Sequence, residues 1–259
     1  MFDSHCHLTD LEDPQGAIID AQKAGVGSML TCGHSLASNR AELSLRDRVP
    51  GLSIALGLHP WNADEDVEVA LDLIERHQPA VVGEIGLDLW GEVPIQPLAR
   101  QLYVLEAQLH LARKLNLAVT LHSRKAIEPL LGALRNHPGV RGALHAWSGS
   151  YEQLRPFLDL GMYLGIGGAV TRSRAKRLQR VAAAAPLDRI LLETDSPAIG
   201  MDIAEPPHVR PAHVTRVAEA VAKLRAMDVA ELEARTDENA ARLFGERVLA
   251  RPRVTQGDP

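Results

Sequence analysis

The chain opens with Met1-Phe2-Asp3-Ser4-His5-Cys6-His7, a short strand-like stretch in which two histidines stand two positions apart. Because side chains alternate faces along a β-strand, His5 and His7 point the same way, together with Asp3. Two imidazoles on one face of a strand are half of a metal site. The pair could equally be a chance occurrence or part of a hydrogen-bonded core, so later segments must decide.

Seven further strand-like runs follow, rich in Val, Ile and Leu and mostly apolar on both faces, as buried parallel strands are. With the first they cover 1–8, 28–33, 52–59, 80–88, 117–123, 141–148, 162–169 and 188–195. The intervening segments have helical spacing, as in 64–77 and 97–116, and 211–245 has that of two helices. This alternation predicts an α/β fold, a closed (β/α)8 TIM barrel with its site at the C-terminal ends of the strands. An open doubly wound sheet is the alternative, but no glycine-rich nucleotide loop favours it.

Length and composition are those of a soluble enzyme, with 259 residues, 46% of them hydrophobic and 24% charged. We expect one hydrolase barrel domain over 1–259, with a flexible tail at 246–259. The net charge of −5 argues against broad coating of nucleic acid, although it is compatible with a local basic patch. The two cysteines form no C-x-x-C pair, and we find neither a signal-peptide pattern nor a membrane-length apolar run. A cytoplasmic location without membrane contact is therefore expected.

Polar residues interrupt the strands at their C-terminal ends, just before each loop. They are His5, His7, His59, Glu84, Asp88, His122, His145, Glu193 and Asp195. In a parallel barrel these ends converge on one mouth, where barrel enzymes carry out their chemistry. A carboxylate such as Glu84 inside an apolar strand is unfavourable unless it is paired or metal-bound. The remaining candidates, His34, His77, His110 and His137, are interpreted as ordinary surface or packing residues.

Six segments carry a specific resemblance: Asp3-Ser4-His5-Cys6-His7, Gly57-Leu58-His59-Pro60, Gly83-Glu84-Ile85-Gly86-Leu87-Asp88, Leu121-His122-Ser123-Arg124, His145-Ala146-Trp147-Ser148-Gly149-Ser150 and Glu193-Thr194-Asp195-Ser196-Pro197. In this order they resemble the successive signatures of the TatD-type metal-dependent deoxyribonucleases, of the amidohydrolase-like superfamily. The resemblance covers residues 2 to about 245, and the stretch from Gly86 to Pro94 is most similar to the YjjV-like branch. Ala146-Trp147 and Leu89 depart from the usual family pattern, which bears on substrate shape rather than on metal binding.

The resemblance implies two divalent metal ions. His5, His7, Glu84 and Asp195 would hold the first, and Glu84 would bridge to the second, which His122 and His145 complete. Histidine and carboxylate donors suit Mg²⁺, Mn²⁺ or Zn²⁺ without selecting among them. The implied reaction is hydrolysis of phosphodiester bonds by a metal-bound hydroxide, with Asp195 as general base and Glu84 as the shared catalytic carboxylate.

Residues beyond the strand ends are expected to bind the substrate. Arg124 is best placed to hold a phosphate, and Arg174 could face the mouth, whereas Lys176, Arg177 and Arg180 have the spacing of a solvated helix face. Trp61, Trp90 and Trp147 suggest a stacking surface for bases, with a packed loop as the alternative for Trp147. His59 and Glu193 complete the candidate substrate-binding residues; Glu193 is expected to orient a metal ligand or the substrate, with a structural pairing as the alternative.

Residues of this kind are compatible with three functions. The first is a deoxyribonuclease that acts as an exonuclease on single-stranded DNA ends, as the resemblance implies. The second is a metal-dependent ester or amide hydrolase, such as a D-aminoacyl-tRNA deacylase, because the same hydroxide attacks a carbonyl as readily as phosphorus. The third is a non-enzymatic metal or nucleic-acid binding module, which would not need a general base. No stable protein partner is expected.

Overall fold

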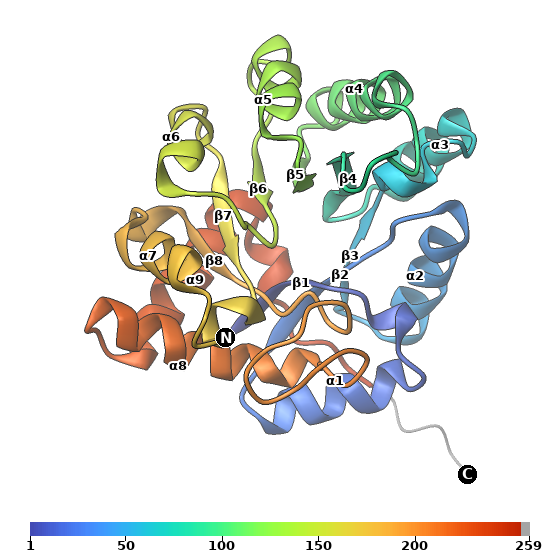
Figure 1. The fold of residues 1–259 in the computed structure, drawn as a ribbon. Helices are drawn as coiled ribbons and strands as arrows, with labels where there is room; N and C mark the ends of the chain where they lie inside the picture. Colours follow the sequence, from blue (N-terminus) through green and yellow to red (C-terminus); the bar gives the residue numbers. More distant parts are fainter. Residues whose placement is uncertain (255–259) are drawn as a thin grey trace.

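The apolar runs form strands that are buried along almost their whole length. The computed structural model describes residues 1–254, and within these residues each of eight strands pairs in parallel with the next, in the order β1 to β8. Figure 1 looks into the ring of strands, which the helices surround. The strands are β1 (Phe2–Cys6), β2 (Ser28–Cys32), β3 (Ser53–Leu56), β4 (Val81–Asp88), β5 (Ala118–Arg124), β6 (Gly142–Leu144), β7 (Tyr163–Ile166) and β8 (Ile190–Leu192). The prediction of a (β/α)8 barrel is confirmed.

The helices lie where the sequence has helical spacing. They are α1 (Pro14–Lys23), α2 (Leu36–Arg48), α3 (Val67–His77), α4 (Leu98–Lys114), α5 (Ile127–Asn136), α6 (Tyr151–Asp159), α7 (Lys176–Ala184), α8 (Val214–Arg225) and α9 (Val229–Phe244). The helix α3 begins at Val67 rather than at 64 because the Asp66 side chain accepts hydrogen bonds from the N–H groups of Glu68 and Val69. Within residues 1–254, no helix combines the length and the apolar character that crossing a bilayer requires.

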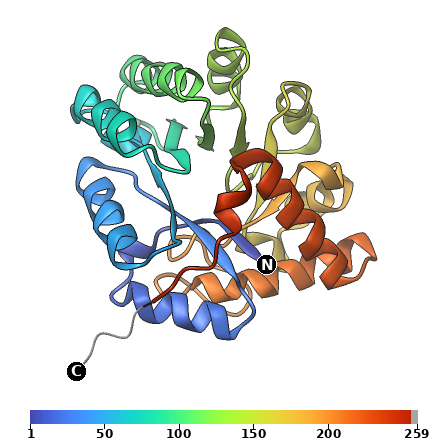
Figure 2. The ribbon, with the colours of Figure 1, turned by 180° about the vertical axis from the view of Figure 1, so that it is seen from behind.

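The N-terminal end of the barrel is closed by α9. Its Ala240 and Leu243 belong to one buried cluster with the first residues of several strands, among them Phe2, Val81 and Ala118. Figure 2 shows this end from behind, with α9 in red crossing the strand ends. Because apolar side chains fill that end, a ligand is expected to reach the barrel from the opposite end, where the polar strand-end residues lie.

A seam between β1 and β8 closes the ring. An isolated parallel bridge joins the two segments. The His7 N–H donates to Ser196 O at 2.7 Å, and the Asp195 N–H donates to His5 O at 2.9 Å. These bonds exclude the alternative of an open sheet. They also bring the histidines of the first strand and the carboxylate after the last strand to one place.

The segment after α9 packs against the barrel as far as the structure describes it. A 3-10 helix covers Glu246–Leu249, and Val248 is buried. The Arg253 N–H donates to Pro50 O at 2.9 Å, and Pro252 O accepts from Gln22 Nε2 at 2.6 Å. Residues 246–254 are therefore packed, in place of the flexible tail that we expected there. The rest of that expectation, 255–259, lies outside the described residues.

A buried glutamate on α2 predicts a pH-dependent stability. Glu42 Oε1 accepts from the hydroxyls of Thr9 and Thr31 at 2.8 Å each, and Oε2 has no partner within residues 1–254. Burial raises the pKa of Glu42 to about 7, although the two hydroxyls oppose this. The folded protein thus retains a proton that the unfolded chain releases, so this carboxyl's contribution to stability is complete below pH 4.5 and is lost as pH rises through about 7.

Glu42→Gln, which keeps the acceptor but cannot ionise, should therefore gain stability relative to wild type by about 2–3 kcal/mol between pH 5 and pH 8. Urea unfolding at both pH values measures this difference. The exposed Glu12→Gln should follow the wild-type profile. Parallel profiles for Glu42→Gln and wild type would show that the buried carboxyl does not titrate in this range.

Candidate metal centre

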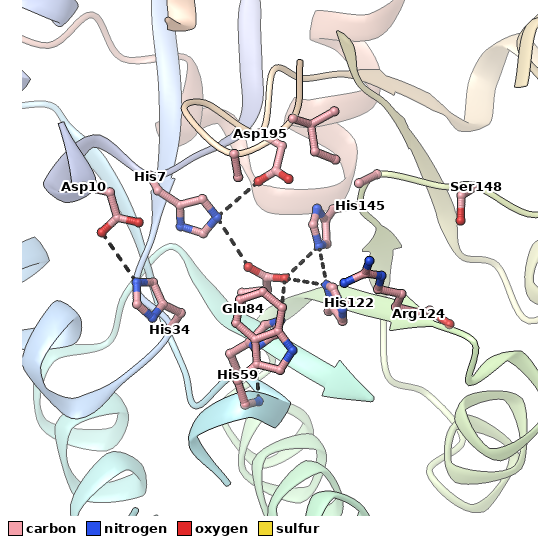
Figure 3. A pocket seen from close by; sticks show the side chains of 15 residues that line it. His7, Asp10, His34, His59, Glu84, His122, Arg124, His145, Ser148 and Asp195 are labelled. Carbon is pink, nitrogen blue, oxygen red and sulfur yellow. Dashed lines mark hydrogen bonds and ion pairs between the residues drawn. The ribbon is translucent and has the colours of Figure 1, made fainter. Parts of the chain in front are cut away.

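Glu84 of β4 lies at the centre of the strand-end residues, and its two oxygens face different neighbours (Figure 3). Oε2 lies 3.4 Å from His7 Nε2 and 3.4 Å from His5 Nε2. Asp195 completes this side, with Oδ1 at 3.2 Å from His7 Nε2 and 3.8 Å from His5 Nε2. Residues from β1, β4 and the segment after β8 therefore surround one point.

The other oxygen, Glu84 Oε1, faces three further histidines. It lies 2.7 Å from His145 Nε2, 3.0 Å from His122 Nδ1 and 3.4 Å from His59 Nε2. The rings of His145 and His5 stack with centroids 4.0 Å apart, so the two sides are adjacent. Glu84 thus reaches both groups of histidines, because it enters the barrel from a strand between them.

A glycine allows β4 and β5 to approach closely beside Glu84. Gly86 pairs in register with His122, and its φ of 146° is a value that residues with a side chain rarely adopt. A Cβ at this position would overlap the His122 backbone. Glycine at position 86 therefore determines how near His122 comes to Glu84.

The conformation around Asp195 is also held from β1. Asp195 has a left-handed φ of 51°, which persists in non-glycine residues only where the surroundings impose it. The buried carboxylate of Asp3 accepts from the N–H and the hydroxyl of Thr194, at 3.0 and 2.7 Å. Asp3 thereby fixes the residue before Asp195, a role that its place on the face of His5 and His7 did not reveal.

Hydrogen bonds on the far ring nitrogens orient the histidines. His7 Nδ1 donates a hydrogen bond to Cys32 O at 2.8 Å, which leaves Nε2 as the atom that can bind a metal. His122 Nε2 lies 3.1 Å from Asp88 Oδ2 and donates to it, which leaves Nδ1 toward Glu84. His5 Nδ1 is held by Thr120 Oγ1 at 2.9 Å. In its neutral form each ring therefore presents the lone pair of its other nitrogen to the centre, as metal-ligating histidines do.

Asp88 is itself held in place by a network. Its Oδ2 accepts from Trp61 Nε1 at 2.8 Å and its Oδ1 from the Trp90 N–H at 2.9 Å. Gln101 of α4, which is buried, accepts from the Asp88 N–H and donates to its carbonyl. Burial raises the pKa of Asp88, but hydrogen bonds from His122 and Trp90 outweigh this and lower it to about 2. Asp88 thus remains an acceptor that orients His122.

His59 has the opposite tautomer. Its Nδ1 accepts from the Trp61 N–H at 3.2 Å. Burial lowers the pKa of His59 to about 4 despite the charge of Glu84, so the ring is neutral at physiological pH. A neutral ring that accepts at Nδ1 carries its proton on Nε2, the atom that faces Glu84. His59 is therefore a hydrogen-bond donor at the centre, although its position beside Glu84 and His122 also suits a ligand.

The charges at the centre fit divalent cations. Burial raises the pKa values of Glu84 and Asp195, but neighbouring histidines outweigh this and hold both well below their usual range. Burial lowers the pKa of His7, but the Asp195 carboxylate, with Oδ1 3.2 Å from Nε2, raises it to about 10, and Glu84 likewise raises the pKa of His145 to about 9. Two buried carboxylates thus attract positive charge strongly.

Unsatisfied atoms point to the same conclusion. Within residues 1–254, the buried atoms His5 Nε2, His145 Nδ1 and Asp195 Oδ1 make no hydrogen bond. Three groups of donor atoms lie within 4.8 Å of one another: His5, His7 and Glu84; His5, His145 and Asp195; and His59, Glu84 and His122. Nitrogen and oxygen donors at this spacing suit Zn²⁺, Mn²⁺ or Mg²⁺. The residues present therefore fit bound cations.

A cavity of about 520 Å³ opens above the centre. His34, interpreted from the sequence as an ordinary surface or packing residue, lines it, so that interpretation was wrong. Its Nε2 lies 3.5 Å from Asp10 Oδ1, and Asp10 also lines the cavity (Figure 3). Its place in the sequence could have indicated this, because His34 follows the end of β2 just as other site residues follow the ends of their strands.

The residues expected to bind the substrate do not all line the main cavity. Arg124 lines the cavity, and its guanidinium lies 4.2 Å from the ring centre of Trp90, which is 53% exposed and supports the arginine from outside the cavity lining. Glu193 does not line the cavity; it is buried and accepts from the N–H of Ala146, the residue after His145, so it orients the segment that carries this histidine. Arg174 lines a neighbouring cavity.

Trp147 is packed in the interior, which was the alternative to a stacking surface for bases. Trp147 is 3% exposed, and its ring packs against Phe157 with centroids 5.9 Å apart. It therefore offers no face on which a base could stack. Trp61, which is 45% exposed and lines the main cavity, keeps such a face.

Known proteins resemble this chain over almost its whole length. Residues 2–245 match the family described as TatD related DNase. The sequence is 34% identical to an uncharacterized metal-dependent hydrolase YjjV of Escherichia coli K12, covering 94% of this chain and 97% of that one. It is 35% identical to a 3'-5' ssDNA/RNA exonuclease TatD of Cronobacter sakazakii, with the same shares covered. The crystal structure of the E. coli YjjV, a TatD homologue, superposes with a TM-score of 0.86 at 32% identity, covering 94% of this chain and 97% of that one.

Proposed function

The chain belongs to the TatD-related DNase family and is a metal-dependent hydrolase, and from this premise we propose that it removes nucleotides from the ends of single-stranded DNA. The observation that carries the proposal is the two-sided surrounding of Glu84, in which five histidine nitrogens lie within 3.4 Å of its two oxygens. A relative described as a 3'-5' ssDNA/RNA exonuclease supports the choice of substrate.

Two cations would be held, one on each side of Glu84. His5, His7 and Asp195 bind on the side of Oε2, and His122 and His145 bind on the side of Oε1. This division is supported by the distances of each nitrogen from the two oxygens. When bound, the cations supply positive charge to the phosphoryl oxygens and lower the pKa of a water toward neutrality.

The protein's own residues hold the substrate and move the proton. Asp195 Oδ1, which makes no hydrogen bond within residues 1–254, accepts the proton of the attacking water as general base. His59 donates its Nε2–H to a phosphate oxygen, because its tautomer is fixed by the Trp61 N–H. Arg124, held over Trp90, binds the phosphate from the cavity wall. Trp61 offers its exposed face to the terminal base.

We expect the purified protein with Mg²⁺ or Mn²⁺ to shorten end-labelled single-stranded DNA, and chelation with EDTA to abolish this. His122→Ala should lower the rate by about 10²-fold or more, because it removes a nitrogen donor at the centre. The matched control is His110→Ala, which removes an exposed histidine of α4. Gel analysis of DNA labelled at the 5' or the 3' end also gives the direction of removal.

Three outcomes would contradict the proposal. Equal cleavage by wild type and His122→Ala would point to a contaminating nuclease. Cleavage that persists in EDTA would exclude a metal-dependent reaction. Turnover of a D-aminoacyl-tRNA or a chromogenic carboxylic ester, without any cleavage of DNA, would replace the nuclease with an ester hydrolase that uses the same centre.

A further inference from the structure

A second cavity, of about 460 Å³, lies next to the cavity above the metal centre. The two share Ala146, Ser148 and Ile199 in their linings, so they are separated only by the loop after β6 and by one side chain after β8. Figure 3 shows Ser148 to one side of the histidines of the metal centre. The two cavities therefore adjoin, and consecutive parts of a chain-like ligand could occupy them.

Two arginines with no acidic partner line this second cavity. No carboxylate within residues 1–254 lies within 4 Å of Arg174 or Arg177. In contrast, Arg172 from the same segment pairs with Glu205 at 2.5 Å. Arg177 is exposed on α7, as its helical spacing predicts, and it also lines the cavity beside Arg174. Two unpaired guanidinium groups beside one cavity form a recognition site for a phosphate.

A buried donor in the same wall also lacks a partner. Trp147 is among the residues that line the second cavity, and its buried Nε1–H has no acceptor within residues 1–254. Phe157 packs against the ring, and Gly149 allows the chain to pass close to its edge, so the indole is held in place. Buried donors are satisfied in nearly all folded proteins, which indicates that a ligand or a solvent molecule provides the acceptor here.

The rest of the lining is apolar or small. It consists of Gly167, Ala169, Ala175 and Leu178, together with Ile199 on the shared side. Such a surface suits a deoxyribose and a base, and a volume of about 460 Å³ lies within the range of small-molecule sites. The cavity thus combines an anion-binding rim with an apolar wall, which is the chemistry of a nucleotide.

We infer that the second cavity binds the nucleotide next to the scissile bond, with its phosphate on Arg174 and Arg177. The inference rests on the proposed function, since it assigns the neighbouring part of the same strand. It makes the enzyme one that holds two consecutive nucleotides of a single strand. Oligonucleotides are then better substrates than esters that carry only the scissile phosphate.

The test measures binding separately from cleavage. A fluorescently labelled ten-nucleotide thymidine strand with phosphorothioate linkages, which resist hydrolysis, is titrated with the full-length, metal-loaded protein and followed by anisotropy. Arg174→Gln with Arg177→Gln should weaken binding roughly 10- to 100-fold. The dependence of log affinity on log salt should become shallower by about 0.7 for each phosphate that no longer meets an arginine. Trp147→Phe, which keeps the packing but removes the N–H, should weaken binding about 2- to 10-fold.

The matched control is Lys176→Gln with Arg180→Gln, which removes the same charge from the same segment without changing the cavity lining. It should bind like the wild type. In kinetic assays, the ratio of kcat/KM for the oligonucleotide to that for a dinucleoside monophosphate should fall about tenfold or more in the double arginine variant.

The outcomes separate the two claims. If the wild type cleaves DNA but the double arginine variant binds like the wild type, or no more weakly than the control, the inference is wrong and the nuclease stands. If the wild type cleaves no DNA, the proposed function is wrong, and the binding titration still decides whether the cavity holds a phosphate-bearing strand.

Discussion

Asp195→Asn is expected to lower the rate of phosphodiester hydrolysis by about 10³- to 10⁴-fold at saturating metal and substrate. The carboxylate is buried, and its Oδ1 makes no hydrogen bond within residues 1–254, although His7 Nε2 lies 3.2 Å away. Neighbouring histidines, His7 foremost, hold its pKa well below the usual range against the effect of burial, so that it is an ionised acceptor at neutral pH. Asparagine has the same shape but accepts no proton, so the fall in rate measures the proton transfer together with the removal of the charge.

The measurement is kcat on end-labelled single-stranded DNA over a range of metal concentrations. The backbone bond from Asp195 to His5 O survives the substitution, so circular dichroism and the Tm of the metal-free protein should change little. Asp188→Asn, which alters an exposed aspartate just before β8, serves as the matched control and should retain wild-type activity. A rate within about tenfold of wild type for Asp195→Asn would exclude it as general base.

Glu84→Gln is expected to remove both cations together. Its two oxygens face the two groups of histidines separately, so one substitution removes a negative ligand from each side. The wild type should bind two metal ions per chain, and the variant fewer than one under the same dialysis. Metal analysis by mass spectrometry gives the stoichiometry without depending on activity.

Thermal unfolding gives a second measurement of the same effect. A metal present at about 100 times its Kd stabilises a protein by about 2.7 kcal/mol per site, so adding Mn²⁺ should raise the Tm of the wild type by several degrees. This increment should disappear in Glu84→Gln and persist in Glu42→Gln, which changes a buried glutamate outside the centre. Retention of two metal ions by Glu84→Gln would show that the carboxylate does not bridge.

The charge distribution agrees with the proposed nuclease, which acts at the ends of DNA, rather than with a protein that coats nucleic acid. The whole chain has a net charge of −5, while Arg124, Arg174 and Arg177 lie around the two adjoining cavities. Positive charge gathered beside the two cavities attracts anions there, although the chain as a whole is acidic. This arrangement explains why composition alone argued against nucleic-acid binding in general and left a local patch possible.

Much of the centre could be predicted because it depends on local patterns. Apolar runs and helical spacing are read within single segments, and they led to the eight strands and to the C-terminal mouth. The polar residues that interrupt those runs, such as Glu84 and His122, had to converge there because parallel strands in a barrel all end at one rim. The family resemblance added the assignment of these residues to two metal ions, which their spacing alone does not give.

What could not be predicted depends on contacts between distant segments. Which Glu84 oxygen faces which histidine follows from strand register, and the tautomer of His59 follows from a turn that returns the Trp61 N–H to its ring. Arg177 showed only helical spacing, which does not reveal whether a neighbouring loop leaves a cavity beside it.

The sequence alone therefore determined the barrel and the set of donor residues, because strand periodicity and strand-end position are properties of short segments. The tertiary structure decided how those donors divide around one carboxylate, that Asp10 and His34 share the mouth, that Glu193 and Trp147 are buried behind it, and that a second cavity adjoins the first. The physical reason is that these features arise from packing between loops far apart in the chain, which local spacing does not encode.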